Sequence, residues 1–129
     1  MSDPYTRLYQ EQVAAAYRDT RYRGPMDQPD AAVTKTNPLC GDTITLYGRV
    51  IVVDDVKKLE LRFDGRGCVL SQATASLVCQ KACELSYQQV AALEQKDILA
   101  LIPLALGPSR MQCVLLAYHT LVELLSKLR

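Results

Sequence analysis

The residues of this sequence best suited to metal and sulfur chemistry are three widely spaced cysteines and one aspartate. Cys40, Cys68 and Cys113 each stand at a predicted junction: before a strand, between a strand and a helix, and in the first turn of the last helix. Asp42 follows Cys40 by two residues, so in an extended segment both side chains leave the chain on the same side. Three thiolates and a carboxylate are a suitable set for tetrahedral Zn²⁺ or for terminal ligands to a small iron–sulfur cluster.

Local structure around these cysteines favours their reactive form. Cys68 and Cys113 are predicted near helix N-termini, where oriented N–H groups favour the thiolate that binds metal or attacks sulfur. The neighbouring glycines Gly41, Gly65 and Gly67 permit tight turns and close backbone approach. The cysteine spacing matches no compact zinc-finger pattern, so spacing alone leaves buried structural cysteines as the alternative.

The elements that must position these residues are predicted from hydrophobic periodicity. An amphipathic helix is predicted over 5–17 and an irregular connection, rich in Pro, Asp, Gly and Thr, over 19–37. Period-two alternation predicts strands over 43–52 and 58–63, paired antiparallel around a turn at Asp54-Asp55.

The C-terminal half is predicted to be helical. Helices are expected over 69–85, over 87–93 with Ser86 as N-cap, and over 97–106. A final helix is expected with Ser109 as N-cap and Gln112 completing a capping box. The order helix, hairpin, helices predicts one α+β domain spanning 1–129, with helices packed on one face of a small antiparallel sheet.

Composition narrows the function classes. A formal net charge of +1 over 129 residues gives no strong basic field, which argues against nucleic acid as a partner. No run of eighteen apolar residues suggests a membrane span, and the polar N-terminus lacks the apolar core of a signal peptide, so a cytoplasmic location is expected. Five cysteines are an odd number, and in a reducing compartment spaced cysteines more often indicate metal or thiol chemistry than disulfides.

Three stretches of sequence carry a resemblance to a known family: NPLCGD at 37–42, FDGRGCVLSQATAS at 63–76 and GPSRMQC at 107–113. In this order they resemble the U-type iron–sulfur cluster assembly family, which comprises IscU, SufU and the N-terminal domain of NifU. The resemblance covers most of the chain and implies a SufE/NifU-like fold.

The resemblance implies a scaffold or sulfur-transfer protein rather than a stand-alone enzyme. Iron and sulfide would be assembled into a [2Fe–2S] cluster, with persulfide sulfur from a pyridoxal-phosphate cysteine desulfurase and with apo iron–sulfur proteins as recipients. Cys40, Asp42, Cys68 and Cys113 match the family's ligand positions, and Arg110 matches an arginine of the SufU motif Gly-Pro-x-Arg-x-x-Cys. In the SufU branch the similar site holds zinc and one cysteine, for which Cys113 is the candidate, accepts sulfur. A monomer or weak homodimer is expected.

Two features of the sequence point to different branches of that family. Gln112 replaces the histidine that IscU members carry before the last cysteine, which favours SufU. The segment between Cys68 and Cys113 lacks room for the SufU insertion, which favours IscU, yet the IscU motif Leu-Pro-Pro-Val-Lys is also absent. Both branches therefore stay open.

Other thiols and rival functions have simpler explanations. Cys79 and Cys83, one helical turn apart, could form a second thiol pair, but buried small hydrophobes are favoured. His119 lies six residues beyond Cys113 and points elsewhere around the helix, so it is expected to be no ligand.

The main alternative to a scaffold or sulfur-transfer function, from another functional class, is a structural zinc-binding interaction domain. A thiol enzyme ranks last because no second histidine or paired acid supports a general base.

Overall fold

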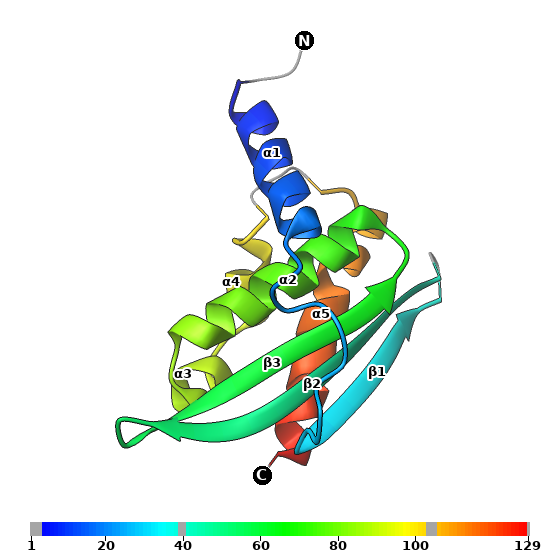
Figure 1. The fold of residues 1–129 in the computed structure, drawn as a ribbon. Coiled ribbons are helices and arrows are strands. Elements are labelled where there is room, and N and C mark those ends of the chain that lie inside the picture. The colour runs from blue at the N-terminus through cyan, green and yellow to red at the C-terminus, as the bar shows by residue number, and fades with distance from the viewer. Residues whose placement is uncertain (1–3, 39–40, 103–105, 129) are drawn as a thin grey trace.

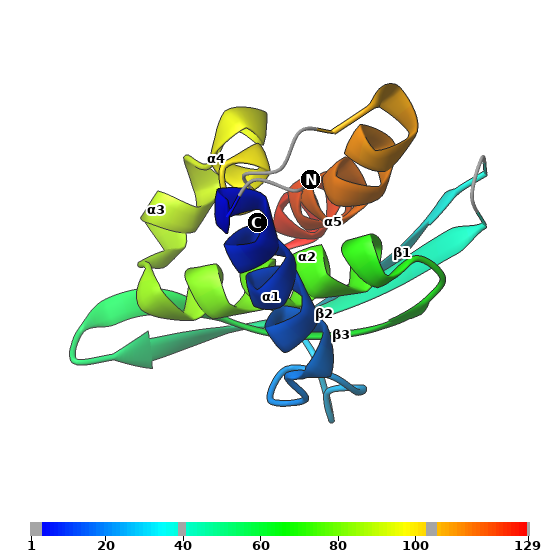
Figure 2. The same ribbon diagram turned by 90° about the horizontal axis from the view of Figure 1, so that it is seen from above.

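The structure, a computed structural model, describes residues 4–38, 41–102 and 106–128. Its elements in chain order are α1 (Pro4–Arg18), β1 (Ala31–Asn37), β2 (Asp42–Val53), β3 (Val56–Arg66), α2 (Val69–Glu84), α3 (Tyr87–Ala91), α4 (Gln95–Leu99) and α5 (Pro108–Lys127). The fold is α+β, as predicted: α2 to α5 cover one face of an antiparallel sheet, and α1 packs on α2 (Figures 1 and 2).

Within the described residues, the sheet has three strands in the order β1-β2-β3, all antiparallel. The prediction of an irregular connection over 19–37 is therefore wrong for 31–37, which forms the edge strand β1. Its pattern is weak because only Val33 and Asn37 are buried, while threonines and a lysine fill most of the other positions. The register Asn37↔Asp42 and Thr43↔Arg66 brings the start of β2 beside the ends of both neighbouring strands.

The core lies between the sheet and the two long helices α2 and α5. Ile44 and Leu46 of β2 and Phe63 of β3 are wholly buried, and their neighbours along each strand alternate toward the other face. This alternation is what one buried sheet face requires. Residues 70–76 of α2 are all buried, because small side chains let this helix fit between the sheet, α1 and α5.

Some predicted helix boundaries change. Ser86 caps α3 through a complete capping box with Gln89, as predicted. The capping box predicted at Ser109 is wrong, because Pro108 already occupies the first helical position of α5 and Gly107 is the N-cap. The helix predicted over 97–106 is instead the short α4, and residues 103–105 lie outside the described part of the chain. In the described segments we find no helix with the length and apolar character needed to span a membrane.

Candidate metal centre

The sheet register brings two of the predicted ligand residues to one end of the molecule. Asp42 is the first residue of β2, and Cys68, the N-cap of α2, comes two residues after β3 ends at Arg66. Because β2 and β3 are antiparallel, the start of one lies beside the end of the other. Figure 1 shows this junction where the arrow of β3 leads into α2.

Cys113 completes the group from α5, which packs against α2. It lies five residues after Pro108 and thus in the second helical turn, not in the first as predicted. The helix macrodipole acts mainly on the first turn, so it acts on Cys113 less than expected.

The ligand atoms of Asp42, Cys68 and Cys113 all lie within 4.8 Å of one another. Among the described residues, no other group of three or more His, Cys, Asp or Glu side chains converges in this way. Asp42 and Cys113 are 1% and 3% exposed, whereas Cys68 is half-buried, so the group opens toward solvent on the Cys68 side.

The Asp42 carboxylate is held by one oxygen and unsatisfied at the other. The backbone N–H of Cys68 donates to Asp42 Oδ1 at 2.7 Å. Oδ2 is buried and has no hydrogen-bond partner in the structure. A buried carboxylate oxygen without a donor is costly unless a cation compensates it, so a bound metal ion suits this position.

Cys68 is held rigidly at the start of α2. Its Sγ accepts a hydrogen bond from the Leu70 N–H at 3.4 Å, which is the contact of an N-cap side chain. Its carbonyl oxygen accepts from Ser71 Oγ at 2.9 Å and from the Gln72 N–H at 3.3 Å. Ser71 was not predicted as a site residue; a serine three residues after the capping cysteine is the sequence signal for it.

Gly67 makes the approach of Asp42 to Cys68 possible. Its φ of +116° lies in a region that side chains other than glycine rarely adopt. A Cβ at this position would lie 2.3 Å from Asp42 Oδ1. Both features require glycine, in agreement with the role predicted for it.

The remaining predicted site residues have varied positions. Cys40 lies outside the described residues, so the structure gives no position for the fourth predicted ligand. Arg110 is exposed in the first turn of α5. His119 is exposed, stacks near Tyr118 and is not part of the cluster.

The second thiol pair divides between core and surface. Cys79 is 1% exposed within the core, and burial raises the pKa of its thiol far above the usual value. Cys83 is exposed and shares a hydrogen bond with Tyr22. Burial of Tyr22 and this hydrogen bond both raise the pKa of the Tyr22 hydroxyl. The preferred interpretation as core residues is therefore right for Cys79 and wrong for Cys83.

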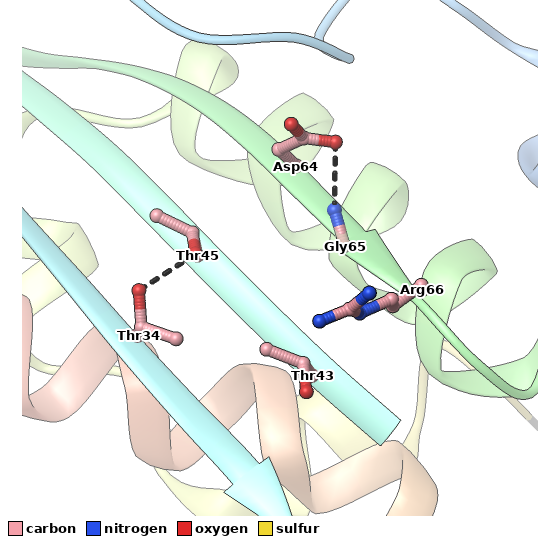
Figure 3. A pocket seen from close by; sticks show the side chains of 6 residues that line it. All are labelled: Thr34, Thr43, Thr45, Asp64, Gly65 and Arg66. Atoms are coloured by element: carbon pink, nitrogen blue, oxygen red, sulfur yellow. Dashed lines mark hydrogen bonds between the residues drawn. The ribbon is translucent and has the colours of Figure 1, made fainter. Parts of the chain in front are cut away.

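A polar basin lies on the outer sheet face, on the side without helices (Figure 3). Thr34, Thr43, Thr45, Asp64, Gly65 and Arg66 line it. The hydroxyls of Thr34 and Thr45 lie 2.7 Å apart, and the Gly65 N–H donates to Asp64. Thr43 follows Asp42 in β2 but points to the opposite face, so this basin and the centre lie on opposite faces of the sheet.

Comparisons with known proteins show the family and the fold. A family model described as the NifU-like N-terminal domain matches residues 8–128. The iron–sulfur cluster assembly scaffold protein IscU of Thermotoga maritima is 27% identical, over 96% of this chain and 96% of its own. The zinc-dependent sulfurtransferase SufU of Bacillus subtilis is 28% identical, over 93% of this chain and 90% of its own. A crystal structure of SufU from Fervidobacterium islandicum superposes with a TM-score of 0.72 at 21% identity, covering 92% of this chain and 97% of that one, which shows a shared fold.

Proposed function

Because this chain belongs to the NifU-like N-terminal domain family, we propose that it is an iron–sulfur cluster assembly scaffold. Its cargo is iron and sulfide, held as a [2Fe–2S] cluster by Asp42, Cys68 and Cys113, with Cys40 as the fourth ligand. A cysteine desulfurase supplies the sulfur, and apo iron–sulfur proteins take the cluster. The relatives named as IscU scaffolds support this role.

One observation carries the proposal: two thiols and a carboxylate share a sphere in which no two ligand atoms are more than 4.8 Å apart. Thiolate sulfur is the donor that iron–sulfur clusters use, and a carboxylate is a weaker, harder ligand in such a set. A scaffold must release what it holds, and one oxygen ligand among sulfurs suits a cluster that is passed on.

Sulfur delivery needs a nucleophilic thiolate at the centre. The Cys113 thiolate attacks the outer sulfur of the desulfurase persulfide; a new S–S bond forms to Cys113 while the old S–S bond breaks, and the desulfurase cysteine leaves as a thiolate. No net oxidation occurs. Because Cys113 is only 3% exposed, this step requires the N-terminal end of α5 to move and expose the Cys113 thiol, next to the half-buried Cys68. Arg110, exposed one turn before Cys113, would pair with the anionic persulfide.

A second candidate function is a zinc-dependent sulfur acceptor. It is favoured by the SufU relative, 28% identical over 93% of this chain, and by Gln112 in the position of the IscU histidine. Zinc would be held by the same residues and would keep their thiols deprotonated.

Anaerobic reconstitution distinguishes the two functions. The metal-free protein is incubated with ferrous iron, cysteine and a cysteine desulfurase, and the absorption spectrum is followed before apo-ferredoxin is added. The scaffold function predicts a [2Fe–2S] spectrum that transfers to ferredoxin, is lost in Cys68→Ser and persists in the control Cys83→Ser. Zinc-dependent stimulation of the desulfurase without any cluster would instead establish the sulfur acceptor. If neither cluster nor stimulation is seen, both proposals fail.

The rival structural zinc domain makes a different prediction about folding. In the structure the buried apolar residues of β2, β3, α2 and α5 form a continuous core that extends far beyond the centre, although Cys113 belongs to it and Cys68 packs against it. Removing metal should therefore leave the far-ultraviolet circular dichroism spectrum largely unchanged, whereas a structural zinc site would lose its fold on chelation.

A further inference from the structure

An unusual amount of apolar surface lies at the end of the molecule opposite the metal centre. Among the described residues, six large apolar side chains are exposed, and four of them, Val52, Val53, Val56 and Val122, are found there. The first three surround the tip of the β2–β3 hairpin, which projects beyond the helices in Figure 1. Clustered exposed apolar residues on a small domain commonly mark an interaction surface.

The hairpin tip is an ordered projection. Val53 pairs with Val56, and the two residues between them, Asp54 and Asp55, have φ of 51° and 66°. Two consecutive left-handed residues form the tight turn whose twist matches that of the strands. The tip therefore presents valines beside two carboxylates as a fixed knob.

A groove lies next to this knob, between α3, α5 and the start of β3. Its volume is about 470 Å³, and polar and apolar surface share its walls about equally. Most of the side chains that line it are apolar or aromatic: Lys57, Tyr87, Val90, Ala91, Leu93, Tyr118, Leu121, Val122 and Leu125. Lys57 is the one charged residue among these lining residues, and its Nζ lies 4.2 Å from the centre of the Tyr87 ring. An adjoining hollow shares Lys57 and Tyr87 and includes Asp55 and Val56, so knob and groove form one continuous surface.

We propose that this surface binds a second copy of the chain. A two-fold interface uses the same patch on both subunits, so the patch must be complementary to itself. Here an apolar knob that ends in carboxylates stands beside a groove lined by valine, leucine and tyrosine side chains and one ammonium group. Turned by 180°, the knob of each copy enters the groove of the other, and Asp55 of each meets Lys57 of the other.

This arrangement leaves the metal centre of each subunit accessible. The pairing of β2 with β3 puts the knob, at Val53 and Val56, at the opposite end of the hairpin from Asp42. Figure 1 shows the hairpin tip far from the junction of β3 with α2, so both metal centres of the dimer stay open. The patch is small, and interfaces below about 1,200 Å² are generally weak. The dimer therefore forms reversibly, with dissociation at high dilution.

Sedimentation velocity of the purified full chain over a concentration series tests the proposal. The wild type should shift from monomer to dimer as concentration rises. Asp55→Lys and Lys57→Asp should each weaken dimerisation by about tenfold or more, because like charges then face each other twice. An equimolar mixture of the two variants should dimerise again, since both charge pairs of the mixed dimer are opposite. Circular dichroism of each variant confirms that it is folded.

Two valines of equal exposure provide the matched control. Val122 and Val69 are both 47% exposed on helices, but Val69 lies at the start of α2 beside the metal centre. Val122→Asp should abolish the dimer and Val69→Asp should leave it intact. The proposal is overturned by a wild type that stays monomeric at every concentration, by equal effects of the two valine variants, or by charge variants that do not associate when mixed.

Discussion

Replacing Gly67 by alanine should disrupt the metal centre and destabilise the fold together. The new methyl carbon would lie 2.3 Å from Asp42 Oδ1 and 2.8 Å from its Cα, so the aspartate must move. That movement breaks the 2.7 Å hydrogen bond from the Cys68 N–H to Oδ1 and withdraws the carboxylate from the two sulfurs.

The expected loss combines two effects. An alanine held at φ near +116° costs about 1–3 kcal/mol, and a lost hydrogen bond to a charged group costs about 1.5–3 kcal/mol. Gly67→Ala should therefore lower the free energy of unfolding of the metal-free protein by about 2.5–6 kcal/mol, a large share of the 5–15 kcal/mol typical of a domain. Urea unfolding followed by circular dichroism measures this change, and zinc competition with a chromophoric chelator measures the loss of affinity.

Alanine substitutions at two other glycines separate the effect of backbone strain from the effect of the steric clash. Gly41 has a φ of +72°, but a Cβ added there would meet no atom within 4 Å, so Gly41→Ala reports backbone strain without the clash. Gly107 has a φ of −72° and open space around it, so Gly107→Ala has neither the strain nor the clash and should cost no more than about 1 kcal/mol for replacing an N-cap glycine. A Gly67→Ala protein within about 1 kcal/mol of wild type, with unchanged zinc affinity, would refute this account of the Asp42–Cys68 approach.

Other variants test the same geometry. Asp42→Asn keeps an oxygen acceptor but loses the charge, so it should reduce zinc affinity by at least the roughly tenfold typical of outer-shell changes. Asp42→Ala should in addition lower the free energy of unfolding by about 1.5–3 kcal/mol, because it also loses the hydrogen bond from the Cys68 N–H. Equal stability of the two variants would argue against that hydrogen bond. Iodoacetamide should modify the exposed Cys83 first, Cys68 next, and the buried Cys113 and Cys79 slowest in the metal-free protein, as followed by peptide mass spectrometry; rapid labelling of Cys113 would contradict its burial. Burial raises the pKa of the Cys79 thiol, so the folded protein keeps this proton above about pH 8.5, where the unfolded chain loses it. The free energy of unfolding should therefore fall as pH rises above that value, and less steeply in Cys79→Ala; parallel curves would show that Cys79 does not contribute.

Sequence analysis correctly predicted those strands and helices in which burial of one face produces a regular alternation of apolar and polar residues. Ile44, Leu46 and Phe63 alternate with polar residues, so the β2–β3 hairpin was evident, and the Ser86 cap marked α3 correctly. The strand β1 was missed because an edge strand needs few buried residues, and Thr34 and Lys35 gave it a polar composition.

The candidate site was predicted by resemblance rather than by spacing. Nothing in the intervals between Cys68 and Cys113 fixes their meeting, which depends on how α5 packs against α2. Periodicity also could not show that Asp42 Oδ2 is buried without a donor, because that requires the register of β2 with β3. The position of Cys113 in the second turn followed from Pro108, which begins α5 earlier than a Ser109 cap would allow.

The most direct test of the central claim is the zinc K-edge X-ray absorption spectrum of the zinc-loaded protein. A centre built from Asp42, Cys68, Cys113 and the proposed ligand Cys40 predicts three sulfur scatterers at about 2.3 Å and one oxygen at about 2.0 Å. A shell with fewer than two sulfurs would contradict the account, because Cys68 and Cys113 would then not share a metal.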